Sequence, residues 1–303
     1  MNLRADIEVR HRVTPAAVFA ALGVMFIAFQ LWIFIRWAAD GQAHAVSSTP
    51  DSISAPHAVV TWMLQAVVLL LAVVFTGIVV RQCRRAGHIT FDAALLLGYF
   101  LSFWQSPLFN YETVALVVNP HSVNVTTWGP YIPGWDSPRP QDQPETLLGL
   151  SGAGFVALMM WVWIQAWLTG RIARYFPDWT WSRLLPASLL AGLAVDFLIE
   201  AIWMNIGFYS YAIAPTALTL LHGHWFGPQL LYYAAVTLFI STAAVVIRHD
   251  AQARGTVPYI FCGTQTLGLR LSGTVRLLAG VGLANVLLLA YFVTCVLITH
   301  FLG

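Results

Sequence analysis

Two carboxylic acids, Asp196 and Glu200, lie one helical turn apart in "AVDFLIEAIWMNIGFY", a stretch otherwise made of large apolar side chains. In a helix, residues four apart project from one face. If this stretch crosses a membrane, each carboxylate costs at least about 2.5 kcal/mol, and two adjacent ones also repel. At least one acid is therefore expected to keep its proton at neutral pH. A neutral acid can donate a proton, so the pair could act in catalysis. The structural alternative is that the acids only form hydrogen bonds between packed helices.

Amides and aromatic rings are expected at the same depth. With a rise of about 1.5 Å per residue, Glu200 lies about 24 Å above Leu184, and Gln105 lies about 24 Å above Ile89. These groups predict a pocket for an apolar ligand that carries oxygen atoms. For each of them, packing or a place in the interfacial aromatic belt is the alternative. The expected ligand-binding residues are Gln105, Asn110, Trp128, Trp135, Asn205 and Tyr209, with Tyr211, His222 and His224 nearby.

The composition predicts an integral membrane protein. Of the 303 residues, 58% are hydrophobic and 9% are charged, and the mean hydropathy is +0.71. Because a span needs about 20 apolar residues, we expect an all-α, polytopic membrane helix bundle of about seven transmembrane helices in a single domain (residues 1–303). The expected spans are 14–37, 59–80, 90–109, 150–170, 184–209, 228–247 and 277–301.

The arginines predict the orientation. Thirteen of the 15 lie in the N-terminal segment and in every second connector, whereas the opposite connectors contain only Arg139. This bias places the N-terminus in the cytoplasm and the C-terminus outside. Residues 110–149 are rich in proline and aromatic residues and are expected to form a folded outer cap. Residues 249–275 are amphipathic and are expected to form a cytoplasmic interfacial segment.

Several functions are excluded by missing residues. The chain has no Lys, so it cannot form a retinal Schiff base. Its net charge of +2 is too small to indicate a nucleic-acid-binding protein. "GAGFVA" (152–157) imitates a dinucleotide motif inside an expected membrane helix, and no P-loop, HExxH or GxSxG occurs. The three single cysteines and the His222-Gly-His224 pair form no complete metal set. We therefore expect no nucleic-acid partner, cofactor or metal.

Four stretches resemble the AveC-type spirocyclases, membrane proteins of avermectin, milbemycin and meilingmycin biosynthesis. They are "FWQSPLFNY", "TTWGPYIPGW", "DFLIEAIWMNIGFYSY" and "RHDAQARG", which follow one another between residues 100 and 290. The resemblance implies a lipophilic macrolide precursor, closure of a dihydroxy-ketone into a 6,6-spiroketal and, in some members, a further loss of water.

Such a reaction needs acid, which agrees with the acid pair. A cation forms when the hemiketal hydroxyl leaves, as in glycoside hydrolysis, where one carboxyl is protonated and another is ionised. We expect Glu200 to be the acid and Asp196 to stabilise the cation, although the two roles could be reversed. Gln105, Asn110 and Asn205 would orient hydroxyls, and Trp128 or Trp135 would shape the face of attack.

Three alternatives remain open. A membrane terpene cyclase also places acids in an apolar cavity, and a proton-coupled transporter of a lipophilic metabolite needs buried acids as well. The absence of repeats and of paired broken helices disfavours the transporter. A purely structural scaffold predicts that replacing both acids by amides leaves the product profile unchanged.

Overall fold

The computed structural model describes residues 13–46, 55–213, 218–220 and 229–302. In this part of the chain, six helical stretches are long and apolar enough to cross a membrane. The protein is therefore an integral membrane helix bundle, as the composition predicts. These stretches are Pro15–Ala39, Ala55–Ala86, Gly152–Tyr175, Trp181–Asn205, Leu230–Arg254 and Leu269–Leu302.

The α-helices are, in chain order, α1 (Pro15–Ala39), α2 (Ala55–Ala86), α3 (Phe91–Phe100), α4 (Gly152–Ala157), α5 (Met159–Tyr175), α6 (Trp181–Asn205), α7 (Leu230–Ala235), α8 (Ala243–Arg254) and α9 (Leu269–Leu302). A π-helical segment, η5 (Val236–Thr242), joins α7 to α8. Short 3-10 helices are η1 (Phe103–Asn110), η2 (Gly129–Tyr131), η3 (Pro140–Asp142), η6 (Tyr259–Phe261) and η7 (Thr264–Thr266). The strands are β1 (Leu116–Val118), β2 (Asn124–Val125), β3 (Glu145–Thr146) and β4 (Tyr209–Tyr211).

The prediction that the third of the seven spans is a continuous helix over 90–109 is wrong. The α-helix ends at Phe100, where the Ser102 hydroxyl donates to the Gly98 carbonyl (2.7 Å), and the chain continues as the 3-10 helix η1. Pro107 lacks the amide that an α-helix would need there. The broken segment still runs the length of α9. At one end Arg276 donates to the Ile89 carbonyl (3.2 Å), and at the other His300 contacts Glu112 (2.9 Å).

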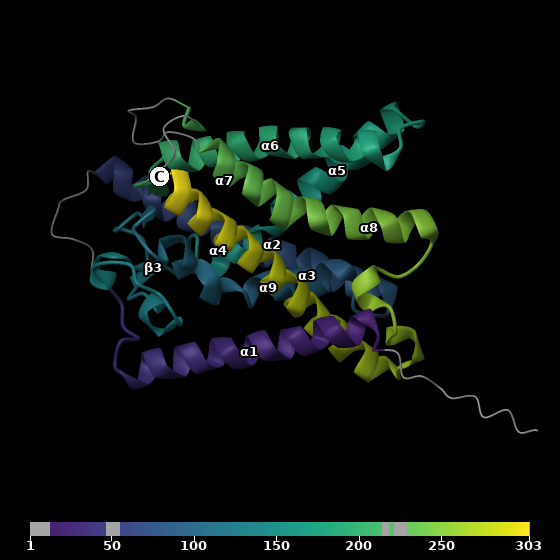
Figure 1. Ribbon diagram of the computed structural model, residues 1–303, viewed down its shortest axis with the longest axis horizontal. Coiled ribbons are helices and arrows are strands. Elements are labelled where there is room, and N and C mark those ends of the chain that lie inside the picture. The colour runs from purple at the N-terminus through teal and green to yellow at the C-terminus, as the bar shows by residue number, and fades with distance from the viewer. Residues whose placement is uncertain (1–12, 47–54, 214–217, 221–228, 303) are drawn as a thin grey trace, which may run out of the picture.

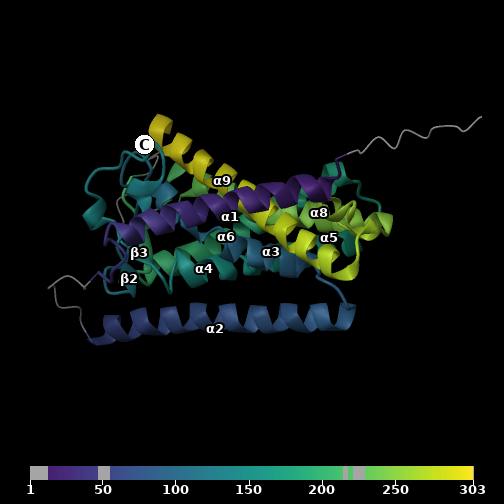
Figure 2. The same ribbon diagram turned by 90° about the horizontal axis from the view of Figure 1, so that it is seen from below.

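Helix α9 crosses the middle of the bundle (Figure 1). It packs closely on α3 and α1 because its contact faces carry small residues. A Cβ atom added to Gly280 would overlap the carbonyl oxygen of Ala94 in α3, and one added to Gly282 would overlap that of Phe19 in α1. Small residues at such crossings let two helix backbones approach each other. Helix α2, by contrast, lies along the outside of the bundle (Figure 2).

The connectors gather at two ends of the bundle. At the end that holds most of the arginines, the Ala16 amide donates to the Cys262 carbonyl (3.2 Å), and Trp181 packs on His249. Residues 249–275 here comprise the end of α8, the turns η6 and η7, and the start of α9; Ile260 and Phe261 are buried.

The opposite end carries the structured segment 110–149, which we call the cap. Strand β1 of the cap pairs antiparallel with β4, and β2 pairs with β3. The fifth span, expected over 184–209, is shorter than predicted, because the chain leaves the helix to form β4. Helix α6 ends at Asn205, and Gly207 (φ 80°) turns the chain into β4.

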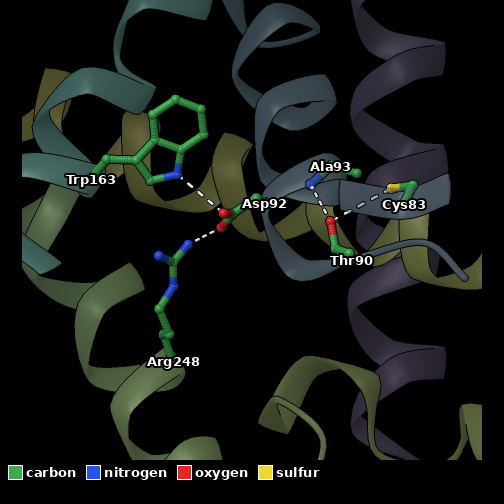
Figure 3. A network of polar contacts seen from close by, with 6 residues as sticks. All are labelled: Cys83, Thr90, Asp92, Ala93, Trp163 and Arg248. Carbon is green, nitrogen blue, oxygen red and sulfur yellow. Dashed lines mark hydrogen bonds and ion pairs between the residues drawn. The ribbon is translucent and has the colours of Figure 1, made fainter. Parts of the chain in front are cut away.

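A polar network ties three helices together away from the cap (Figure 3). Asp92 in the first turn of α3 forms an ion pair with Arg248 of α8 and accepts a hydrogen bond from the Trp163 indole of α5 (3.1 Å). Thr90 caps α3, since its hydroxyl accepts the Ala93 amide (3.3 Å).

Candidate functional site

One face of α6 carries its polar residues into the bundle. Ser188, Gly192, Asp196 and Glu200 follow one another at intervals of four, and all four are buried. The intervening residues Leu190, Leu198 and Ile202 are exposed on the opposite face. The acid pair therefore points into the protein and away from the apolar outer surface.

A cavity of about 120 Å³ lies beside the end of this face that is nearest the cap. Its wall is formed by the cap and β4, by η1 and η5, and by α2, α4, α5, α6 and α9. Most of it is apolar, with Phe109, Trp203 and Phe292 among the large side chains. Ten residues on this wall have oxygen-bearing side chains: Ser106, Asn110, Asp142, Gln143, Glu145, Ser151, Glu200, Tyr209, Tyr211 and Tyr291.

Glu200 is the acid of the pair that reaches this cavity. It is 8% exposed and is hydrogen-bonded to the phenol of Tyr211 in β4. Its Oε2 atom is buried and has no hydrogen-bond partner among the described residues. Burial raises the pKa of Tyr211 well above its usual range, so the phenol remains a proton donor. A carboxyl oxygen without a protein partner is free to contact a bound molecule.

Asp196 lies one turn deeper and does not line the cavity. It is fully buried, and the Trp161 indole donates a hydrogen bond to its Oδ1 atom. Trp161 itself is part of the cavity wall. A layer of hydrogen-bonded side chains lies one to two turns deeper still: Gln165 donates to Ser188 (3.2 Å) and to Thr242 (2.6 Å). This layer holds α5, α6 and η5 in register below the acids.

A second buried acid, Glu145 in β3, faces the cavity from the cap. Three hydroxyls donate to its carboxylate: Ser106 (2.5 Å), Ser151 (2.6 Å) and Thr127 (3.1 Å). Sequence reasoning missed Glu145, because it lies in a connector, in "QPETLLG", with no helical period to show which way its side chain points. Only the pairing of β3 with β2 and the close approach of η1 bring it to the cavity.

Of the expected ligand-binding residues, Asn110 and Tyr209 are on the cavity wall. The Asn110 side chain is already used by the backbone, since its oxygen accepts the amides of Ala115 (3.0 Å) and Leu116 (2.8 Å) and its nitrogen donates to the Leu116 carbonyl (2.9 Å). Tyr209 is buried, and its hydroxyl has no hydrogen-bond partner among the described residues. Tyr209 is therefore better placed than Asn110 to contact a ligand.

The other four expected ligand-binding residues do not line the cavity. Gln105 donates to the Asn285 side chain (2.9 Å), because η1 is a 3-10 helix and turns this residue toward α9. Trp128 donates to the Trp104 carbonyl (2.7 Å), and the Trp135 indole reaches the Pro107 carbonyl (3.5 Å). Both tryptophans fasten the cap to η1. Asn205 is exposed at the end of α6.

Within the described ranges, no group of three or more His, Cys, Asp and Glu side chains is arranged to hold a metal ion. The His222 and His224 pair lies outside the described residues.

The fold and the cavity define a polytopic membrane protein with carboxylic acids on the wall of a largely apolar internal cavity. The family model of the AveC-like spirocyclases matches residues 83–303, which include α3, the cap, both acids of α6 and α9. The chain therefore belongs to the AveC-like spirocyclase family, as the resemblance implies. No curated protein and no solved structure matches it.

Proposed function

We propose that this protein is an enzyme that closes a dihydroxy-ketone of a lipophilic polyketide into a spiroketal, by acid catalysis and by holding one conformer. The observation that carries the proposal is Glu200, a buried acid with an unpartnered oxygen on the wall of a mostly apolar cavity. Membership of the spirocyclase family supports this function over the terpene cyclase and the transporter.

The reaction begins when one hydroxyl of the substrate adds to the ketone and forms a hemiketal. Glu200 then donates its proton to the hemiketal hydroxyl, the C–O bond breaks, and a water molecule leaves. The resulting oxocarbenium ion is attacked by the second hydroxyl, which forms the second C–O bond and releases its proton. One water is lost in total, and no electron is transferred. The transition state resembles that of glycoside hydrolysis, in which a protonated carboxyl has the same task.

Asp196 is proposed to act through Glu200. A carboxylate in this apolar setting is costly, and two on adjacent turns cost more, so the pair favours a state in which a proton is retained. The Trp161 indole stabilises an ionised Asp196, which leaves the proton on Glu200. After the transfer, Tyr211 donates to the new Glu200 carboxylate. The negative charge of Asp196 and of the new Glu200 carboxylate also stabilises the cation.

The cavity wall is proposed to decide the stereochemistry. At about 120 Å³ the cavity is smaller than typical ligand pockets of roughly 300–1,000 Å³, so it suits the reacting part of a large substrate. Spiroketals also close without an enzyme in acid. Holding one folded conformer against Phe109, Trp203 and Phe292 favours attack from one face and keeps water from the cation.

The test is incubation of the purified protein with a synthetic long-chain dihydroxy-ketone that can close to a 6,6-spiroketal. We expect closure faster than in the same detergent without protein, and an excess of one configuration at the spiro carbon. A product ratio and a rate equal to those of the acid-only background would overturn the proposal. Loss of a second water, seen by mass spectrometry as an unsaturated spiroketal, would assign the additional dehydration to this chain.

A further inference from the structure

The attacking hydroxyl must lose a proton, and Glu145 is placed to take it. Glu145 and Glu200 line the same cavity, Glu145 from strand β3 of the cap and Glu200 from helix α6. The two acids belong to different elements of the same cavity wall. A molecule bound in the cavity would therefore lie within reach of both carboxyl groups.

The surroundings of Glu145 suit a carboxylate. Hydroxyls of Ser106, Ser151 and Thr127 all donate to its two oxygens, and a carboxylate only accepts hydrogen bonds. Among the described residues, no Arg or His forms an ion pair with it. An ionised Glu145 thus keeps its basicity, since no cation neutralises it.

The balance of forces on Glu145 makes it a stronger base than an exposed glutamate. Burial raises the pKa of Glu145 above its usual range, and the three hydroxyl donors lower it by less. Glu145 also differs from Glu200 in its hydrogen-bond environment. Glu200 has one described donor, Tyr211, whereas Glu145 has three, and Asp196 lies one turn away from Glu200. Repulsion between two adjacent carboxylates favours retention of a proton on this pair.

We propose that Glu145 is a catalytic residue, the general base that takes the proton of the attacking hydroxyl while Glu200 supplies the proton for the departing one. This inference rests on the proposed function. The new C–O bond forms as the O–H bond of the nucleophile breaks, and its proton moves to Glu145. The proton from Glu200 leaves in the released water. After one turnover Glu145 holds one proton more and Glu200 one fewer, and exchange with water restores both.

Two acids with separate tasks also explain why closure would favour one configuration. A base and a proton donor at two separate positions on the wall favour attack by the hydroxyl that lies next to Glu145. In inverting glycosidases, an acid and a base on opposite sides of the reacting carbon determine the configuration of the product in the same way.

The test compares the pH dependence of closure in the wild type and in Glu145→Gln, Glu145→Asp and Thr127→Val. The groups bonded to Glu145 are the hydroxyls of Ser106, Ser151 and Thr127. The other titratable groups on the cavity wall are Asp142, Glu200, Tyr209, Tyr211 and Tyr291. We expect the wild-type rate to rise with pH through the raised pKa of Glu145, because the base works only when ionised. Above that pKa the base is fully ionised, and this limb levels off.

In Glu145→Gln the rate should fall about 100-fold or more, and the rising limb should disappear. Glu145→Asp keeps a carboxylate, so it should keep the limb at a reduced rate. Thr127 does not line the cavity, and Thr127→Val removes one of the three donors, so the limb should move to higher pH. A purely structural role of Glu145 predicts no such shift.

The outcomes separate the two proposals. If the wild type does not accelerate closure over the acid-only background, the proposed function fails. If the wild type is active and folded Glu145→Gln keeps its rate and pH profile, only the role of Glu145 fails. If Glu145→Gln does not fold, an unmoved limb in Thr127→Val refutes the base, and a limb at higher pH supports it.

Discussion

Glu200 and Asp196 contact different groups although they share one face of α6. Each acid has one oxygen without a partner among the described residues, but only Glu200 lines the cavity, whereas Asp196 is fully buried and bonded to Trp161. In the proposed mechanism, distance from the substrate, rather than the residue type, therefore separates their tasks. The acid that touches the substrate must carry a transferable proton, and the deeper one needs only to hold charge or a hydrogen bond.

This difference predicts unequal losses. Glu200→Gln should lower the rate of closure by about 100-fold or more, because an amide cannot serve as the acid. Asp196→Asn keeps an oxygen for the Trp161 indole and should cost about tenfold in rate. Rates and spiro configuration, measured by chiral chromatography, provide the test. Asn205→Ala, at the exposed end of the same helix, is the control and should match the wild type. Equal activity of Glu200→Gln and wild type would remove Glu200 from the mechanism.

Two features hold the helices around the cavity. At the end of the bundle away from the cap, the Asp92 and Arg248 ion pair joins α3 to α8, and the Trp163 indole adds α5 (Figure 3). Along the middle, the small residues of α9 let α3 and α1 pack against it. Both features lie outside the cavity wall, so they are expected to affect stability before chemistry.

The ion pair should behave as a coupled unit. Arg248→Gln leaves Asp92 as an uncompensated, largely buried charge and should lower the free energy of unfolding by about 3 kcal/mol. Adding Asp92→Asn should recover part of that loss, because no charge then remains. Thermal unfolding in detergent of the two single variants and the double variant measures the coupling. Single losses that simply add would show that the two side chains do not interact.

The contact between α3 and α9 should not tolerate a side chain at Gly280. Gly280→Val would drive a side chain into the Ala94 carbonyl and should separate α3 from α9, lowering the melting temperature strongly. Gly77 in α2 is the matched control, since nothing lies within 4 Å of a Cβ atom added there. Gly77→Ala should leave the melting temperature unchanged or raise it, because alanine is the better helix former. Unfolding curves of the two variants that coincide would contradict this packing role.

At the scale of the whole molecule, the connectors gather at two ends, and most arginines lie at the end opposite the cap. The bias of arginines toward the cytoplasm then predicts that the cap, the acids and the cavity lie in the outer half of the membrane. A lipophilic substrate made in the cytoplasm would have to reach such a cavity through the lipid. The orientation of the chain therefore bears directly on the route of its substrate.

Labelling of cysteines in intact cells tests this orientation. In a variant without the three native cysteines, Gln42→Cys lies exposed near the cap and Gln252→Cys lies exposed at the opposite end. A maleimide that cannot cross membranes should label position 42 in intact cells, and position 252 only after the membrane is opened. The reverse pattern would place the cap and the cavity on the cytoplasmic side.

The sequence by itself determined the membrane class, six of the spans and the inward direction of the acid pair. These properties depend on local patterns. An apolar run of about 20 residues crosses a membrane wherever it stands, and acids four apart share a face in any helix. Ser188 and Gly192 lie on the same face at the same spacing of four residues and are buried with the acids.

Only the tertiary structure decided where connectors and broken helices place their side chains. Gln105 was expected at the depth of Glu200 on a continuous helix, but η1 turns it to Asn285. Glu145 reaches the cavity because β3 pairs with β2 and because Ser106, which is 39 residues away in the chain, donates to it. Contacts between segments far apart in the chain have no period in the sequence, so no local pattern predicts them.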